Sequence, residues 1–161
     1  MAIRRRKNMN VFDRLYSLFD MYEGFTYDYL LRLAAEKAEY IFKSVRSRDG
    51  SASAENFMVT YCALLACSDF TVSQMEYDFF VKATKINKYS FDSFKQLASK
   101  VSGDYDVKMM YREYGKESYM ASSFDEAMMI FALTLCACDG RISDAERRYI
   151  TDFVPLPGIC D

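Results

Sequence analysis

Two acidic motifs with identical spacing hold the side chains of this 161-residue chain that are most able to do chemistry. Each motif has an Asp, a Ser four residues later and a Glu three residues after the Ser: Asp69, Ser73 and Glu76, then Asp139, Ser143 and Glu146. Carboxylate oxygens are the ligands that Ca²⁺ and Mg²⁺ prefer in proteins. The four acids therefore predict a shared site for one of these cations.

A structural explanation competes with metal binding for most of these residues. In a Ser-x-x-Glu capping box, the Ser hydroxyl and the Glu carboxylate each accept a hydrogen bond from the other residue's backbone N–H at the start of a helix. This predicts that Ser73 and Ser143, and also Ser123 with Glu126 three residues on, begin helices. The Asp of each motif ends the preceding helix, where the helix dipole disfavours an anion. Either hydrogen bonds across the turn or a cation would have to hold it there.

Enzyme chemistry is not expected from this sequence. The chain has no histidine, which is the commonest general base, and it lacks a glycine-rich phosphate loop and a nucleophile elbow. Its five cysteines, an odd number without zinc-site spacing, predict reduced thiols in a cytoplasmic protein. A carboxylate-pair enzyme is the alternative.

The elements that carry these motifs are predicted to be helices. Apolar residues make up 51% of the chain and charged residues 27%, and only 6 Gly and 2 Pro are present to form turns. Residues 27–46 have apolar side chains at helical spacing, whereas residues 53–68 and 127–138 are apolar nearly all round, as helices at the centre of a bundle are. We expect loops at 47–51 and 115–122. The predicted fold is an all-α, single-domain helical bundle of about seven or eight helices.

The two motifs belong to a longer internal repeat. At an offset of 70 residues, an apolar helix, the acidic turn and an amphipathic helix recur, from Leu65 matched with Leu135 to Phe80 matched with Ile150. Such self-similarity predicts a duplicated unit. We expect the two copies to pack about a pseudo-twofold axis, with both turns at the same end of the molecule.

The second motif resembles the hallmark of the TerB-like family, which is named after a bacterial tellurite-resistance protein. Residues 138–146 read Cys-Asp-Gly-Arg-Ile-Ser-Asp-Ala-Glu, and the family pattern is an apolar helix that ends in Ala-Asp-Gly-x-(Ile/Val)-Ser-x-x-Glu. The first motif departs from this pattern, because Phe70 stands where the second has Gly140. A left-handed Phe would cost about 1 kcal/mol, so we expect the first turn to differ in shape.

The resemblance covers roughly residues 53–153 and implies both a fold and a class of function. It implies an all-α duplicated fold with clustered acids that bind a divalent metal, in a family whose related domains are fused to membrane-anchored DnaJ-like co-chaperones. It also divides the chain into a basic, flexible N-terminus (1–10), N-terminal helices outside the resemblance (11–52), a duplicated core (53–154) and a C-terminal tail (155–161).

Two further features are suited to contact a partner. The first is a set of four tyrosines in a stretch rich in Tyr and Met: Tyr105, Tyr111, Tyr114 and Tyr119. Such side chains are frequent at protein interfaces, although they also cover cores. The second is a basic run, suited to an anionic membrane surface or else a solvated terminus: Arg4, Arg5, Arg6 and Lys7. The net charge of −2 disfavours nucleic acid as a partner.

Together these observations predict a bacterial, cytoplasmic TerB-like interaction or regulatory module, connected with stress response, with a divalent-cation site at its acidic turns. It would bind a protein partner or a second copy of itself as a homodimer. Two alternatives stay open: a purely structural or oligomerising helical domain without metal, and a peripheral membrane or co-chaperone-associated module. The longest uncharged stretches, 56–68 and 127–138, are shorter than the roughly 20 residues of a membrane span.

Overall fold

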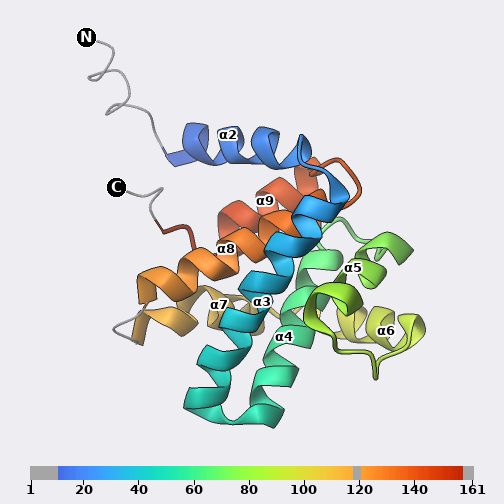
Figure 1. Ribbon diagram of the computed structural model, residues 1–161, viewed down its shortest axis with the longest axis vertical. Coiled ribbons are helices and arrows are strands. Elements are labelled where there is room, and N and C mark those ends of the chain that lie inside the picture. Colours follow the sequence, from blue (N-terminus) through green and yellow to red (C-terminus); the bar gives the residue numbers. More distant parts are fainter. Residues whose placement is uncertain (1–10, 118–120, 158–161) are drawn as a thin grey trace.

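A computed structural model describes residues 11–117 and 121–157, and these residues form helices and their connections with no strand. The α-helices are α2 (Val11–Glu23), α3 (Tyr27–Asp49), α4 (Ser51–Ala66), α5 (Gln74–Thr84), α6 (Phe91–Val101), α7 (Tyr105–Glu113), α8 (Ala121–Ala137) and α9 (Asp144–Phe153). A short 3-10 helix, η1 (Tyr114–Glu117), follows α7. The predicted all-α helical bundle is therefore confirmed (Figure 1).

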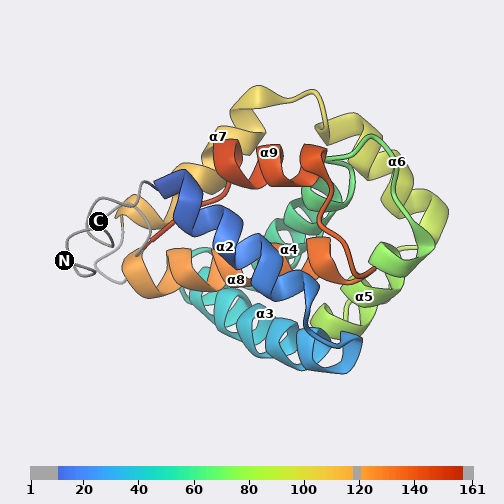
Figure 2. The ribbon, with the colours of Figure 1, turned by 90° about the horizontal axis from the view of Figure 1, so that it is seen from above.

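The two helices that are apolar all round lie at the centre of the bundle (Figures 1 and 2). Leu65 of α4 and Leu135 of α8, matched residues of the repeat, are both fully buried. The two helices are also joined by a polar contact, because the buried Tyr61 hydroxyl donates a hydrogen bond of 2.8 Å to the Met128 carbonyl. Their composition fits this place, since a helix with no polar face needs neighbours on all sides.

Helix α3 completes the centre of the fold. It packs against α8, α4 and α5, and α8 is its most extensive neighbour. Its apolar stripe is buried at Leu30, Ala34, Ala38, Ile41 and Val45, which is the spacing of one helix face. The N-terminal helices and the repeat therefore share one continuous hydrophobic core.

The connection between α3 and α4 is shorter than predicted. The expected loop at 47–51 was wrong, because α3 continues to Asp49 and α4 begins at Ser51. Gly50 alone joins the two helices, with φ of 94°, and its N–H donates a hydrogen bond to the Arg46 carbonyl. A glycine adopts such a φ at little cost, so one residue suffices to reverse the chain.

The predicted start of α8 was also wrong. The helix begins at Ala121, two residues before Ser123, so Ser123 lies inside the first turn and cannot be its N-cap. Glu126 is exposed there. The motif Ser-x-x-Glu indicates a cap only where the chain before it is not already helical. Here the helix begins earlier, at Ala121, and alanine has the highest helix propensity of all residue types.

Side chains cap several of the other helices. Ser73, Ser90, Asp104 and Ser143 are N-caps whose side chains accept a backbone hydrogen bond at the starts of α5, α6, α7 and α9. Within the described residues, none of the helices combines the length and the apolar character that crossing a membrane requires.

Candidate functional site

The two acidic turns have the same backbone shape. Phe70 N–H donates to the Cys67 carbonyl and Gly140 N–H donates to the Ala137 carbonyl, each at 2.9 Å. Phe70 has φ of 75° and Gly140 has φ of 92°. The expectation that the first turn differs in shape was therefore wrong: the turn keeps its left-handed residue even though that residue is Phe.

Both aspartates take part in their own turns. Asp69 Oδ1 accepts a hydrogen bond of 3.4 Å from Thr71 N–H, and Asp139 Oδ1 accepts one of 3.2 Å from Arg141 N–H. Short polar side chains commonly bond the backbone two residues on in this way. Of the two explanations for these acids, hydrogen bonding across the turn is thus present in both copies.

The two capping boxes are confirmed and are nearly identical. Ser73 N–H donates to Glu76 Oε1 and Ser143 N–H donates to Glu146 Oε1, each at 2.9 Å. In the reverse direction, the N–H of each Glu donates to the Oγ of its Ser at 3.1 Å. Each glutamate carboxylate is thereby fixed over the N-terminus of its helix, where the dipole favours an anion.

Both capping glutamates are buried, and they lie close enough to repel one another. Glu76 is 4% exposed and Glu146 is 3% exposed, and the two turns lie on the same side of the molecule in Figures 1 and 2. Burial, with the charges of Glu146 and Asp69 added to it, raises the pKa of Glu76 to about 8. Burial, with the charges of Asp69 and Asp139 added to it, raises the pKa of Glu146 to about 7.

The four acids thus crowd one end of the molecule without forming a ready-made metal cage. The negative charge of Asp69 raises the pKa of the glutamates of both turns, and the negative charge of Asp139 raises the pKa of Glu146. Among the residues that the structure describes, however, no three His, Cys, Asp or Glu side chains are grouped so that they could hold a metal ion. The cation site at these turns remains a prediction.

The cysteines near the turns are buried thiols. Cys62, Cys136 and Cys138 are buried, Cys67 is half-buried, and all four are free, whereas Cys160 lies outside the described residues. Burial, together with the charges of Glu146 and Glu76, raises the pKa of the Cys136 thiol. A thiol in such surroundings stays protonated, and only the thiolate is a good nucleophile or ligand.

One contact with the second turn could not be seen in its motif. Glu23, the last residue of α2, accepts hydrogen bonds from Ile142 N–H at 2.8 Å and from Arg147 Nη2 at 2.9 Å. Arg147 Nε in turn donates to the Ile142 carbonyl at 3.0 Å, and its guanidinium lies 5.1 Å from the Phe19 ring centre. The only hint in the sequence is an acid at the C-terminus of a helix, where the dipole disfavours it.

The first turn lies beside a cavity instead. The cavity has a volume of about 620 Å³ and lies between α4, α6, α7 and α9. Its lining includes Cys67, Phe70, Lys108, Arg148 and Phe153. Phe70 is 89% exposed, which makes it the most exposed large apolar side chain among the described residues.

The predicted partner-binding tyrosines differ in their surroundings. Tyr105 is 62% exposed. Tyr114 is partly buried and donates a hydrogen bond of 2.5 Å to Asp49 Oδ2. Tyr111 was wrongly assigned to a partner surface, because it is 2% exposed and its hydroxyl donates to the Phe57 carbonyl at 2.7 Å. Tyr119 and the basic run at 4–7 lie outside the described residues.

Comparison with known proteins adds no relative to this description. No protein-family model matches the chain, and no curated protein or solved structure is significantly similar to it.

Proposed function

We propose that the chain is a non-enzymatic protein-interaction module of the TerB-like kind, and that its first turn and the adjoining cavity bind the partner. The observation that carries this proposal is Phe70. A large apolar side chain is presented to solvent from a backbone conformation that disfavours it. Strained residues persist where the surrounding structure or a function requires them, so an observed outlier of this kind supports a functional hypothesis.

The matched turn shows why folding alone does not account for Phe70. Gly140 fills the same position in the second turn, at little conformational cost. A Phe in the left-handed region costs about 1 kcal/mol or more, and an exposed fraction of 89% means that little burial offsets this. Contact with a partner would supply the missing burial, because aromatic side chains are frequent anchors of interfaces.

The cavity gives this partner a chemical character. Its lining combines the aromatic rings of Tyr149 and Phe153 with two cationic groups, those of Lys108 and Arg148, and one carboxylate, that of Asp152. Positive charge therefore predominates. The Lys108 ammonium lies 5.2 Å from the Phe153 ring centre. Such a lining suits an apolar side chain flanked by acidic residues, since complementary charge adds specificity to an apolar contact.

Site-specific photo-crosslinking in cells tests the proposal. A benzophenone amino acid at position 70 should form a specific adduct with a protein partner, and Arg148→Glu in the same chain should reduce its yield severalfold. The same probe at Met21, an exposed apolar side chain on α2, serves as the control, and Lys116→Glu, at an exposed lysine, is the matched charge change. Equal adducts from positions 70 and 21, or no response to Arg148→Glu, would reject this surface.

Divalent-cation binding at the acidic turns is a second candidate function. It is favoured by the mutual repulsion of the acids, which adds to the effect of burial in raising the pKa of Glu76 and of Glu146. A bound cation would relieve this repulsion. Calorimetric titration with Ca²⁺, Mg²⁺, Mn²⁺ and Zn²⁺ should then give heat with the native chain and none with Asp139→Ala. The same heats from both proteins would end this candidate.

The cellular role within this proposal follows the resemblance at 138–146. It supports a bacterial, cytoplasmic module connected with stress response. The two alternatives, a structural or oligomerising domain without metal and a peripheral membrane or co-chaperone-associated module, predict different crosslinks. The first gives adducts only between copies of this chain, and the second gives adducts with a membrane-anchored chaperone partner.

A further inference from the structure

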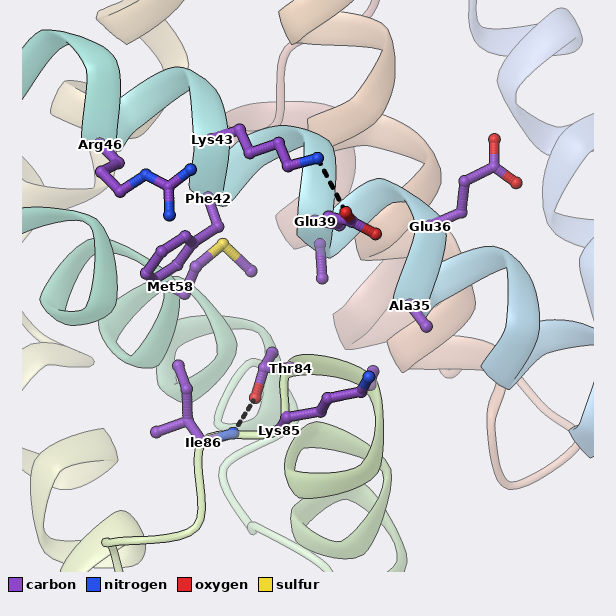
Figure 3. A pocket seen from close by; sticks show the side chains of 12 residues that line it. Ala35, Glu36, Glu39, Phe42, Lys43, Arg46, Met58, Thr84, Lys85 and Ile86 are labelled. Carbon is purple, nitrogen blue, oxygen red and sulfur yellow. Dashed lines mark hydrogen bonds and ion pairs between the residues drawn. The ribbon is translucent and has the colours of Figure 1, made fainter. Parts of the chain in front are cut away.

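Between residues 36 and 46, the outer face of α3 carries charges that are ordered by sign. This charge stripe consists, in chain order, of Glu36, Glu39, Lys43 and Arg46, which are exposed and line a groove, and they follow one another along the helix in Figure 3. Asp28 and Arg32 are exposed nearer the start of α3 and do not line the groove. Both acids lie in the N-terminal part of the stripe and both bases in the C-terminal part. The surface is therefore a linear arrangement of negative followed by positive charge.

This order of charges is complementary to the same order in a second α3 that runs in the opposite direction. Glu36 and Arg46 have their midpoint at position 41, and Glu39 and Lys43 have the same midpoint. The outer pair is about 15 Å apart along the helix axis and the inner pair about 6 Å. If a second α3 runs antiparallel with its position 41 opposite this one, each acid faces a base in both pairs at once. A shared midpoint is the condition that a twofold axis imposes.

An apolar groove runs beside the stripe, between α3, α4 and the end of α5 (Figure 3). It has a volume of about 450 Å³, and its lining includes Ala35, Phe42, Met58 and Ile86. Phe42 is one residue from the common midpoint. A twofold axis through that midpoint would therefore bring the Phe42 rings of two copies close together and join the two grooves on one side of the interface.

We propose that a second copy of this chain occupies this face, and that the protein forms a twofold-symmetric dimer through antiparallel α3 helices. Glu36 of one copy pairs with Arg46 of the other, Glu39 pairs with Lys43, and the two Phe42 side chains meet near the axis. The proposal is independent of the Phe70 surface, which lies on a different part of the fold.

Charge complementarity favours a second copy over another occupant. An acidic partner would be repelled by Glu36 and Glu39, and a basic one by Lys43 and Arg46. The pairing within one chain is no obstacle. Lys43 Nζ lies 2.9 Å from Glu39 Oε1, but their side chains are 61% and 68% exposed, and such surface pairs contribute little. Exchange of this pair for pairs between copies therefore costs little, and contact between the two Phe42 side chains adds burial of apolar surface.

The mass of the full chain in solution tests the dimer. Sedimentation or light scattering of the native chain in low salt should give twice the 18.7 kDa of one chain, and the mass should fall on dilution and as salt is added. Two charge-reversed chains, Glu36→Lys with Glu39→Lys and Lys43→Glu with Arg46→Glu, should each be monomeric. Mixed together, they should recover the dimer mass, because one now has four bases and the other four acids at the positions that pair.

The control reverses charges elsewhere on the surface. Asp92→Lys and Lys95→Glu alter an exposed ion pair on α6 and should leave the dimer intact. Phe42→Glu should abolish the dimer while the helical circular dichroism is retained, since it places two like charges near the axis. A native chain that is monomeric throughout the dilution series, a dimer that survives both reversals, or reversed chains that stay monomeric when mixed would overturn the proposal.

Discussion

Phe70 and Gly140 hold equivalent places in two turns and share a positive φ, but only one of them adopts it freely. The space around Gly140 is open, because no heavy atom beyond its two chain neighbours lies within 4 Å of the point that a Cβ would occupy. Any cost of a side chain there is therefore conformational. Substitutions at these two positions therefore measure backbone strain with little contribution from packing.

We expect Phe70→Gly to raise the free energy of unfolding by about 1 kcal/mol, because it removes the left-handed strain and little buried contact. Gly140→Ala is the reciprocal change and should lower it by a similar amount. Urea denaturation of the three proteins measures both effects. A lower stability for Phe70→Gly would mean that the Phe70 ring is anchored by contacts within the fold.

The buried glutamates predict the pH dependence of stability. Their folded-state pKa values, about 8 for Glu76 and about 7 for Glu146, lie above the ordinary value of 4.5. The folded chain therefore binds protons more tightly than the unfolded chain, and stability falls as pH rises from about 4.5 to about 8. Glu76→Gln keeps the capping box, in which Gln also serves, but cannot ionise.

We expect Glu76→Gln to flatten this fall and to be more stable than the native chain by about 1 kcal/mol or more at pH 8.5, since each unit of pKa shift corresponds to about 1.4 kcal/mol. Thermal unfolding at pH 5 and pH 8.5 measures the difference. Asp92→Asn, at a surface carboxylate of α6, should keep the native profile. Parallel profiles for native and Glu76→Gln proteins would show that this carboxylate is not the source of the pH dependence.

At the scale of elements, α2 is fastened to the second turn by one partly buried network. The side chain of Glu23 is 24% exposed and that of Arg147 is 14% exposed, and Glu23 also accepts the Ile142 N–H. Loss of one partner of such a network leaves the other groups desolvated and unpaired, which costs more than the pair contributed.

We therefore expect Glu23→Ala to lower the free energy of unfolding by about 2 kcal/mol and to increase hydrogen exchange in α2 before other helices. Asp20→Ala is the matched control, because Asp20 is 74% exposed and lies 3.6 Å from the same Arg147. Its effect should stay below about 0.5 kcal/mol. Equal effects of the two substitutions would mean that the network at Glu23 does not hold α2 in place.

The sequence predicted most of the elements and part of their contacts. Apolar periodicity located the central helices, and the capping boxes at Ser73 and Ser143 were confirmed because their bonds are local. Glu23 escaped prediction because its partners are more than 100 residues away in the chain. The cap at Ser123 failed for a related reason: a motif states which bonds can form, and the preceding residues decide whether the helix has already begun.

For the molecule as a whole, the decisive contact is that of α3 with the repeat. The family resemblance separates residues 11–52 from residues 53–154, yet α3 lies against α8, α4 and α5 and buries Ile41 and Val45 in their common core. A sequence resemblance marks shared ancestry or motif, whereas a folding unit is set by which apolar faces cover one another. The two boundaries do not coincide in this chain.

This difference predicts the behaviour of a fragment. Residues 53–154 alone leave uncovered the apolar side of α8 that α3 buries, and a bundle without such a helix loses much of its buried apolar area. We expect this fragment to bind a hydrophobic dye and to unfold without a cooperative transition, as states that lack specific packing do. Addition of residues 11–52 as a separate peptide should restore a cooperative transition, because it restores the missing face.

The control is a substitution on the solvent side of α3. Arg32→Ala in the full chain, which alters only an exposed position of α3, should unfold as the native chain does. A sharp thermal transition of residues 53–154 on their own would show instead that the repeat is an independent folding unit on which α3 merely rests.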